Sequence, residues 1–176
     1  MRGLRFAFVS LFVLAGAAGA QSQQSHTALG DKEYVALDAP AALAHYEAAI
    51  GADPRDYDAL WKASRTLVDI GSYENDAEKR NLMYGKAELY ARRAVEANPE
   101  DPEGHFHLAR ALGKNALTQG TRARVKYATD VRGHALECLK LNPKHAGCLH
   151  VMGVWNAEVM RLNGFSRMLA RNRSIS

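Results

Sequence analysis

Three dipeptides in which Asp or Asn precedes proline divide this sequence at regular intervals. They are Asp53-Pro54, Asn98-Pro99 and Asn142-Pro143, and their prolines lie 45 and then 44 residues apart. Proline has no backbone N–H and clashes with the preceding helical turn, so each dipeptide is expected to end a helix. An alanine-rich amphipathic run precedes each turn, and a second apolar run follows it. Self-similarity at this period predicts a stack of helix pairs.

Apolar and small residues recur between the turns at helical spacing, while β-branched residues are few, which predicts an all-α fold. The expected helices are residues 41–51, 57–70, 77–97, 102–117, 122–141 and 146–162, after a short helical piece at 31–37. Gly71 is expected to end its helix. The positions predicted to face inward are Ala42, Tyr46, Ala49, Leu60, Ala63, Ser64, Leu67, Ala87, Ala91, Ala94, Leu108, Ala109, Leu112, Val131, Ala135, Cys138, Leu149, Met152 and Gly153.

The N-terminus has the pattern of a secretory signal peptide over residues 1–20. Arg2 and Arg5 precede a short apolar stretch, and Ala18-Gly19-Ala20 forms a small-residue cleavage site. The alternative is an uncleaved membrane anchor, but the apolar stretch is shorter than the roughly 20 residues that cross a bilayer. We therefore expect an exported protein, periplasmic or secreted, that meets the membrane only through its signal peptide. A disordered leader at 21–30, a repeat domain at 31–164 and a basic tail at 165–176 are expected to follow.

The repeat pattern itself resembles the tetratricopeptide repeat. Ala42, Tyr46, Ala49 and Pro54 match the second helix of that repeat, but the period is about ten residues longer than the usual 34. The segments 54–65, 90–99, 105–113 and 150–155 together resemble the regulator of microtubule dynamics family, in particular its bacterial, exported relatives. This resemblance implies a helical-hairpin solenoid with lengthened repeats. Family members usually continue with further repeats, so the resemblance also predicts a C-terminus that is truncated relative to them.

No catalytic motif is apparent in this sequence. No stretch matches a phosphate loop, a nucleophile elbow or a zinc-binding His-Glu-x-x-His helix, so no enzyme activity, cofactor or metal is predicted. His105 and His107 lie two residues apart on a helix and face different ways, and the histidines are expected in caps, in turns and on the surface. Loss of Arg2 and Arg5 with the signal peptide leaves 21 basic against 19 acidic residues, which argues against nucleic acid as a partner.

The first helix of each pair lines the concave side of such a solenoid. The family repeat geometry puts Trp61, Arg65 and Asp69 towards that groove, with Phe106, Arg110, Lys114 and His150. Arg65 and Arg110 occupy equivalent positions, so stacked repeats would present two guanidinium groups, suited to a carboxylate or an acidic peptide. The predicted function is therefore a non-catalytic scaffold that binds a protein or peptide. The alternative is a lipid or small hydrophobic ligand between the helix layers.

Two further expectations concern the C-terminal part. Cys138 and Cys148 flank the Asn142-Pro143 turn, and two interpretations stay open: a disulfide, or two small buried residues in a helix seam. The last helix has no partner helix after it, so Leu149, Met152 and Val159 are expected to leave apolar surface exposed and to favour a homo-oligomer.

Overall fold

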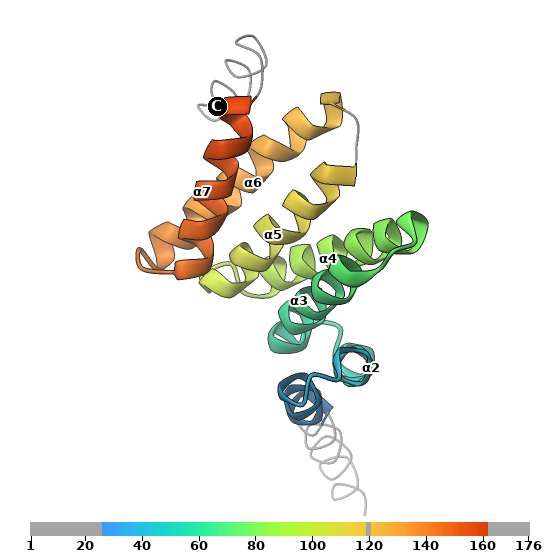
Figure 1. Cartoon of the computed structure of the whole chain (residues 1–176). Helices are drawn as coiled ribbons and strands as arrows, with labels where there is room; N and C mark the ends of the chain where they lie inside the picture. Colours follow the sequence, from blue (N-terminus) through green and yellow to red (C-terminus); the bar gives the residue numbers. More distant parts are fainter. Residues whose placement is uncertain (1–25, 119–120, 162–176) are drawn as a thin grey trace, which may run out of the picture.

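The computed structural model of this chain describes residues 26–118 and 121–161, and every regular element within them is a helix (Figure 1). A helical segment over residues 26–35 precedes the labelled helices. The labelled helices are α2 (Ala39–Ala52), α3 (Tyr57–Tyr73), α4 (Ala77–Ala97), α5 (Pro102–Thr118), α6 (Thr121–Leu141) and α7 (Ala146–Arg161). The all-α prediction is confirmed. The predicted signal peptide, the start of the leader and the tail from residue 165 lie outside the described residues.

The three Asx-Pro turns share one hydrogen-bond pattern. The backbone N–H of Asp53, Asn98 and Asn142 donates to the carbonyl oxygen four residues earlier, at 2.9, 2.9 and 2.8 Å. The side-chain oxygen of the same residue accepts from the amide two residues later, at 2.9, 3.3 and 3.1 Å. Each turn thus ends a second helix and begins the next pair in the same way, so the sequence repeat is also a structural repeat.

Side-chain caps begin several of these helices. Asp56, Asp76 and Asp101 accept hydrogen bonds from amides in the first turns of α3, α4 and α5. Such a cap stabilises a helix by about 1 kcal/mol, because it satisfies an amide that has no partner within the helix. Helix α7 is capped by a different residue type: the amide of Cys148 donates to Nδ1 of His145 at 3.2 Å.

The core lies between neighbouring helices and is built largely from small residues. One buried cluster joins α2, α3 and α4, and a second joins α4 to α7. Ala63, Ala91 and Ala109 are completely buried, so the helix axes can approach closely at these positions. Of the positions predicted to face inward, all those in α2 to α6 are buried.

Two helix boundaries differ from the prediction by more than two residues. The first helix begins by residue 26, inside the leader expected to run to residue 30, because tertiary contacts order it. Gly30 lies so close to the ring of Tyr46 that an added Cβ would come within 2.6 Å of it. Gly71 does not end α3, which continues to Tyr73. An added Cβ there would lie 2.8 Å from the ring of Tyr84, so Gly71 serves the close approach of α3 and α4.

Helix α7 is only partly covered. Val159 is buried, contrary to the expectation, whereas Leu149 is 52% exposed and Gly153 is also exposed, although both were expected to face inward. Met152 is half-buried. No second helix of the described residues packs on this side of α7, which explains the difference.

Candidate partner-binding site

The first helices of successive pairs lie against one another. Helix α3 contacts α5, and α5 contacts α7, so these three form a continuous layer that we call the first-helix layer (Figure 1). Among the described residues, α2, α4 and α6 make no comparable backbone contact with one another. The predicted binding residues Trp61, Arg65, Phe106, Arg110, Lys114 and His150 all belong to this layer.

Arg65 lies at the N-terminal end of this layer, where α3 meets the first helical segment. Its guanidinium carbon is 3.6 Å from the ring centroid of Tyr34 and 5.2 Å from that of Trp61. One Nη donates to the hydroxyl of Tyr46 at 3.5 Å, whereas Nε is buried and has no hydrogen-bond partner. A buried guanidinium N–H without an acceptor is costly, and its burial closes this nitrogen to a ligand from solvent.

Arg110 is paired within the chain. Its Nη2 donates to Oδ1 of Asp69 at 2.5 Å, and both side chains are between a quarter and a third exposed. The other oxygen of Asp69 accepts from the hydroxyl of Tyr34 at 2.8 Å. Burial, together with this hydrogen bond, raises the pKa of Tyr34, so the phenol stays a donor. The structure therefore brings Arg65 and Arg110 together around Tyr34 and Asp69.

Aromatic rings continue the layer towards α7. Trp61 stacks on the imidazole of His107, with ring centroids 5.2 Å apart and planes 9° apart. Phe106 lies 4.6 Å from the ring of His107 and 5.0 Å from that of His145. Gly147 permits this arrangement, because an added Cβ would lie 2.5 Å from the Phe106 ring. Trp61 and Phe106 are both half-buried and form part of one row of rings.

Two histidines, His107 and His145, contact the carboxylate of Glu103. Its Oε1 is 3.0 Å from Nε2 of His145, and its Oε2 is 3.5 Å from Nε2 of His107. The hydrogen bond from His107 and that from His145 lower the pKa of Glu103 to about 2, so it is a carboxylate. Burial lowers the pKa of His107, which keeps that ring neutral near pH 7. Sequence reasoning did not identify this cluster.

The last two predicted residues stand apart from the arginine cluster. Lys114 lies one turn beyond Arg110 and is half-buried, while His150 is exposed near the start of α7. Neither makes a hydrogen bond or ion pair with another described residue. Their positions are those of the predicted layer, but their role in binding stays a prediction.

The histidines were expected in caps, in turns and on the surface. His145 is a helix cap, but six of the seven histidines are at least partly buried. His105 and His107 are buried, because the small residues around them bring α5 close to its neighbours on both sides. Nδ1 of His105 lies 3.0 Å from Nδ1 of His134, which links α5 to α6, and its Nε2 lies 3.0 Å from the carbonyl of Pro99. The carbonyl can only accept, so Nε2 of His105 carries hydrogen and His134 donates through Nδ1.

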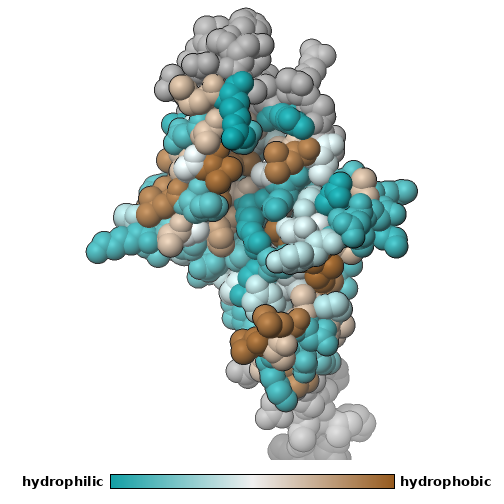
Figure 2. Space-filling model, viewed as in Figure 1, coloured by the Kyte–Doolittle hydropathy of each residue, from teal (hydrophilic) through white to brown (hydrophobic). Residues whose placement is uncertain are grey.

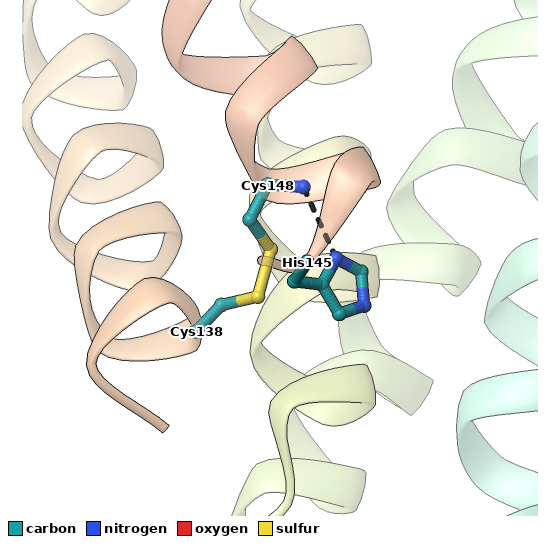
Figure 3. Close-up of side chains that lie close together, drawn as sticks. All are labelled: Cys138, His145 and Cys148. Atoms are coloured by element: carbon teal, nitrogen blue, oxygen red, sulfur yellow. Dashed lines mark hydrogen bonds between the residues drawn. A yellow bond between two sulfur atoms is a disulfide. The ribbon is translucent and has the colours of Figure 1, made fainter. Parts of the chain in front are cut away.

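The two cysteines are bonded in the structure. A disulfide joins Cys138 at the end of α6 to Cys148 at the start of α7, with Cα atoms 6.4 Å apart (Figure 3). Both residues are completely buried. The bond closes a short loop around the third Asx-Pro turn and ties the last described helix to its neighbour.

An open cavity of about 300 Å³ lies outside the first-helix layer. It is lined by Pro54, Arg55, Arg93, Glu96 and Ala97, and the guanidinium of Arg93 donates to the carbonyl of Pro54 at 2.6 Å. Its charged lining suits a turn on the surface rather than an apolar ligand. Among the described residues, no helix combines the length and the apolar character needed to span a membrane.

Comparison with solved structures shows the fold. The chain superposes on the structure described as "First TPR of Spaghetti (RPAP3) bound to HSP90 peptide SRMEEVD" with a TM-score of 0.63 and 12% identity, covering 80% of this chain and 94% of the other. It superposes on the Arabidopsis OM64 TPR domain with a TM-score of 0.62 and 10% identity, covering 80% and 98%. The predicted tetratricopeptide-like solenoid is therefore confirmed.

Comparison with curated proteins points to one family. Regulator of microtubule dynamics protein 1 of Bos taurus is 30% identical over 121 residues, which are 68% of this chain and 38% of that protein. The human protein 1 is 29% identical, covering 63% and 36%, and protein 3 of Xenopus laevis is 23% identical, covering 63% and 24%. The matched region thus spans less than two fifths of these relatives. The family model described as "Regulator of microtubule dynamics protein 1-3" matches residues 22–173, so this chain belongs to that family.

Proposed function

We propose that this protein is a non-catalytic, exported scaffold that binds a protein or peptide on its first-helix layer. Backbone contacts between first helices, without comparable backbone contacts between the described second helices, are what a solenoid shows when it curves with its first helices inside. Such curvature makes the first-helix layer a concave face. The tetratricopeptide fold is itself a protein-interaction scaffold, and no nucleophile with an adjacent base is evident among the described residues.

The observation that carries this proposal is the grouping of Arg65 and Arg110 around Tyr34 and Asp69. Arginine and aromatic side chains dominate binding hot spots, because they supply both contact area and directional donors. A partner carboxylate can compete with Asp69 for Arg110, with the guanidinium of Arg65 on the Tyr34 ring as a second positive charge nearby. Because a ligand must displace Asp69 from Arg110, a strongly acidic ligand should bind better than a weakly acidic one.

A solved neighbour is consistent with a peptide ligand of this charge. The similar repeat of Spaghetti (RPAP3) is bound to an HSP90 peptide of sequence SRMEEVD, which contains three acidic residues. The face seen in Figure 2 mixes hydrophilic and hydrophobic side chains. We infer an acidic peptide segment as the ligand class. No observation favours the alternative of a lipid between the helix layers.

The test is capture of exported proteins by the immobilised protein that starts at Gln21. Arg65→Glu/Arg110→Glu should abolish capture, because the variant replaces both donors with repelling carboxylates. The matched control is Arg55→Glu/Lys144→Glu, which makes the same charge change in two exposed turns and should leave capture intact. Equal capture by both double variants, each with wild-type helicity by circular dichroism, would overturn the proposal.

Export is proposed from the signal sequence alone. Expression with residues 1–20 in a bacterial host should yield a periplasmic protein whose intact mass starts at Gln21. An unprocessed mass in the membrane fraction would favour the anchor interpretation.

We also propose that the open side of α7 supports self-association. Leu149, Val154 and Met160 are 52%, 48% and 61% exposed, and Figure 2 shows hydrophobic side chains over α7. Multi-angle light scattering should show a dimer that Leu149→Lys/Met160→Lys converts into a monomer. A wild-type monomer at high concentration would contradict this.

A further inference from the structure

The turn between α6 and α7 brings together three side chains of metal-binding type. The sulfurs of Cys138 and Cys148 and a ring nitrogen of His145 all lie within 4.8 Å of one another (Figure 3). The cysteines are completely buried, and the His145 side chain is only 11% exposed. Two sulfurs and one imidazole are a ligand set that suits a soft or borderline cation.

The repeat itself does not require these residues. Where α7 has His145 as its cap, α3 and α5 have aspartates, which are stronger helix caps than histidine. Where α6 has Cys138 four residues before the turn, the earlier repeats have alanines. The corresponding residues are Asp56 and Asp101 for His145, Ala49 and Ala94 for Cys138, and Ala59 and Gly104 for Cys148. All three candidate ligands therefore differ from the residues at the equivalent positions of the other repeats.

The hydrogen bonds of His145 orient its ring as a metal ligand requires. Nδ1 accepts the amide of Cys148, so this nitrogen carries a lone pair, and Nε2 must carry the hydrogen that it donates to Glu103 at 3.0 Å. Figure 3 shows Nδ1 on the edge of the ring that faces Cys148. A carboxylate that accepts from the far nitrogen fixes the tautomer and raises the basicity of the ligating nitrogen. Glu103 supplies this carboxylate from α5.

We propose that the reduced protein binds one Zn²⁺ through the Sγ atoms of Cys138 and Cys148 and Nδ1 of His145, with Glu103 supporting the histidine. The fourth position is left for water or an added ligand. Zinc and the disulfide exclude each other, because the same two sulfurs are needed for both. The turn can thus be cross-linked in two alternative ways, by the disulfide or by a bound zinc ion.

The geometry needs only side-chain movement. Tetrahedral zinc with Zn–S bonds of about 2.3 Å separates its two sulfurs by about 3.8 Å, and the separation of sulfur from nitrogen is about 3.6 Å. Both values lie inside the 4.8 Å limit that the three atoms already satisfy.

Reduction of the disulfide and binding of the metal are separate steps. A dithiol or phosphine reductant gives two electrons, the Cys138–Cys148 S–S bond breaks, and two protons complete the two thiols. Zn²⁺ then displaces both thiol protons to solvent, and Nδ1 exchanges its bond to the Cys148 amide for one to the metal. Oxidation of the zinc form to the disulfide would release the ion.

The test uses the full mature chain, reduced in denaturant by a phosphine because the sulfurs are buried, and refolded without oxygen. Zn²⁺ is titrated against a chromophoric chelator, and Co²⁺ reports thiolate ligation through its charge-transfer absorption. The reduced protein should bind one equivalent, and the disulfide form none. His145→Asn keeps a strong helix cap but removes the imidazole, so zinc affinity should fall at least about tenfold. Glu103→Gln should weaken zinc binding by about 10- to 100-fold, because the charged acceptor for Nε2 of His145 is lost.

Three results would overturn the proposal: no binding by the refolded reduced protein, equal affinity in His145→Asn, or equal binding by the disulfide form. Circular dichroism of each form establishes that it is folded before titration. Cys138→Ser/Cys148→Ser, which can form neither the disulfide nor the zinc site, serves as the negative control. Slower air oxidation of the zinc-loaded protein, reversed by a chelator, would support the mutual exclusion directly.

Discussion

Helices α3 and α7 occupy equivalent places in the repeat but lie in different surroundings. Six residues after its turn proline, α3 has Leu60 and α7 has Leu149, yet the first is completely buried and the second is 52% exposed. Ten residues after the proline, Ser64 of α3 is buried and Gly153 of α7 is exposed. The difference is that α4 packs on α3, while no described helix packs on the same side of α7.

This comparison shows that burial in a solenoid depends on the neighbouring element rather than on the helix itself. Each repeat contacts only adjacent ones, so a position that is core in one pair can be surface in another. The same substitution at equivalent positions should therefore have unequal effects. Three predictions use this inequality, beginning with the largest.

Introducing a charge should give the largest difference in the free energy of unfolding between a covered position and the equivalent open one. Ala109 of α5, ten residues after its turn proline, is completely buried, so Ala109→Glu should destabilise the protein by at least about 4 kcal/mol. At the equivalent Gly153, an added Cβ would meet no atom within 4 Å. Gly153→Glu should stabilise α7 of the monomer by about 0.5–1 kcal/mol, because glycine is a poor helix former. Urea unfolding of both variants measures the two effects.

The Gly153→Glu result also reports on self-association. If a second copy covers α7, the variant should lose stability, and the loss should grow with protein concentration. Equal destabilisation of the two variants at low micromolar concentration would show instead that α7 is as well covered as α5.

Truncation of leucine should give the same order with smaller values. Leu60→Ala removes a fully buried side chain and should cost about 2–5 kcal/mol, because it leaves a cavity between α3 and its neighbours. Leu149→Ala should change the free energy of unfolding by no more than about 0.5 kcal/mol. Thermal or urea unfolding provides the measurement, and a loss above 2 kcal/mol for Leu149→Ala would contradict the open-face description.

The smallest effect is the pH dependence of the covered α5–α6 pair. Burial, and then the neighbouring His105, lower the pKa of His134 to about 4 from its ordinary 6.5. The unfolded chain therefore binds the proton first, and stability falls as the pH falls from about 6.5 to about 4. Because His134 keeps some solvent exposure, this loss should be about 1–2 kcal/mol.

The matched variants for this prediction are His134→Gln and His150→Gln. Glutamine at 134 can still donate to His105 but does not titrate, so the stability loss between pH 6.5 and 4 should shrink. Exposed His150 on α7 should have no such effect when replaced. His107 contributes a loss of the same sign, because burial lowers its pKa too, so the difference between variants is the quantity to compare. An unchanged pH profile for His134→Gln would contradict the prediction.

Much of the fold could be predicted, because its signals are local. The three Asx-Pro turns and the alanine stripes specify where helices end and which face is buried, and the predicted boundaries of α4 match the structure. The start of the first helix could not be predicted, since contacts such as that of Gly30 with Tyr46 order it. Gly71 was misinterpreted because a glycine that permits a close helix approach resembles a helix stop.

The candidate binding residues could be placed but not paired. Repeat spacing put Arg65 and Arg110 on the same layer, and the structure has them there. It could not predict that Asp69 would bind Arg110, or that Tyr34, 31 residues before Arg65, would lie beneath its guanidinium. The cluster of Glu103 with His107 and His145 had one available signal, the i, i+4 spacing of Glu103 and His107, which was not used.

The sequence by itself determined the period, the helix ends at the three Asx-Pro turns and the family, because these depend on short-range patterns of proline, alanine and aromatic residues. Tertiary structure alone decided which charges are satisfied within the chain and which helix face stays open. It also brought Glu103 on α5 against His145 at the start of α7, next to the two cysteines. The physical reason is that packing between repeats places side chains 40 or more residues apart within hydrogen-bond distance, and no local pattern encodes those contacts.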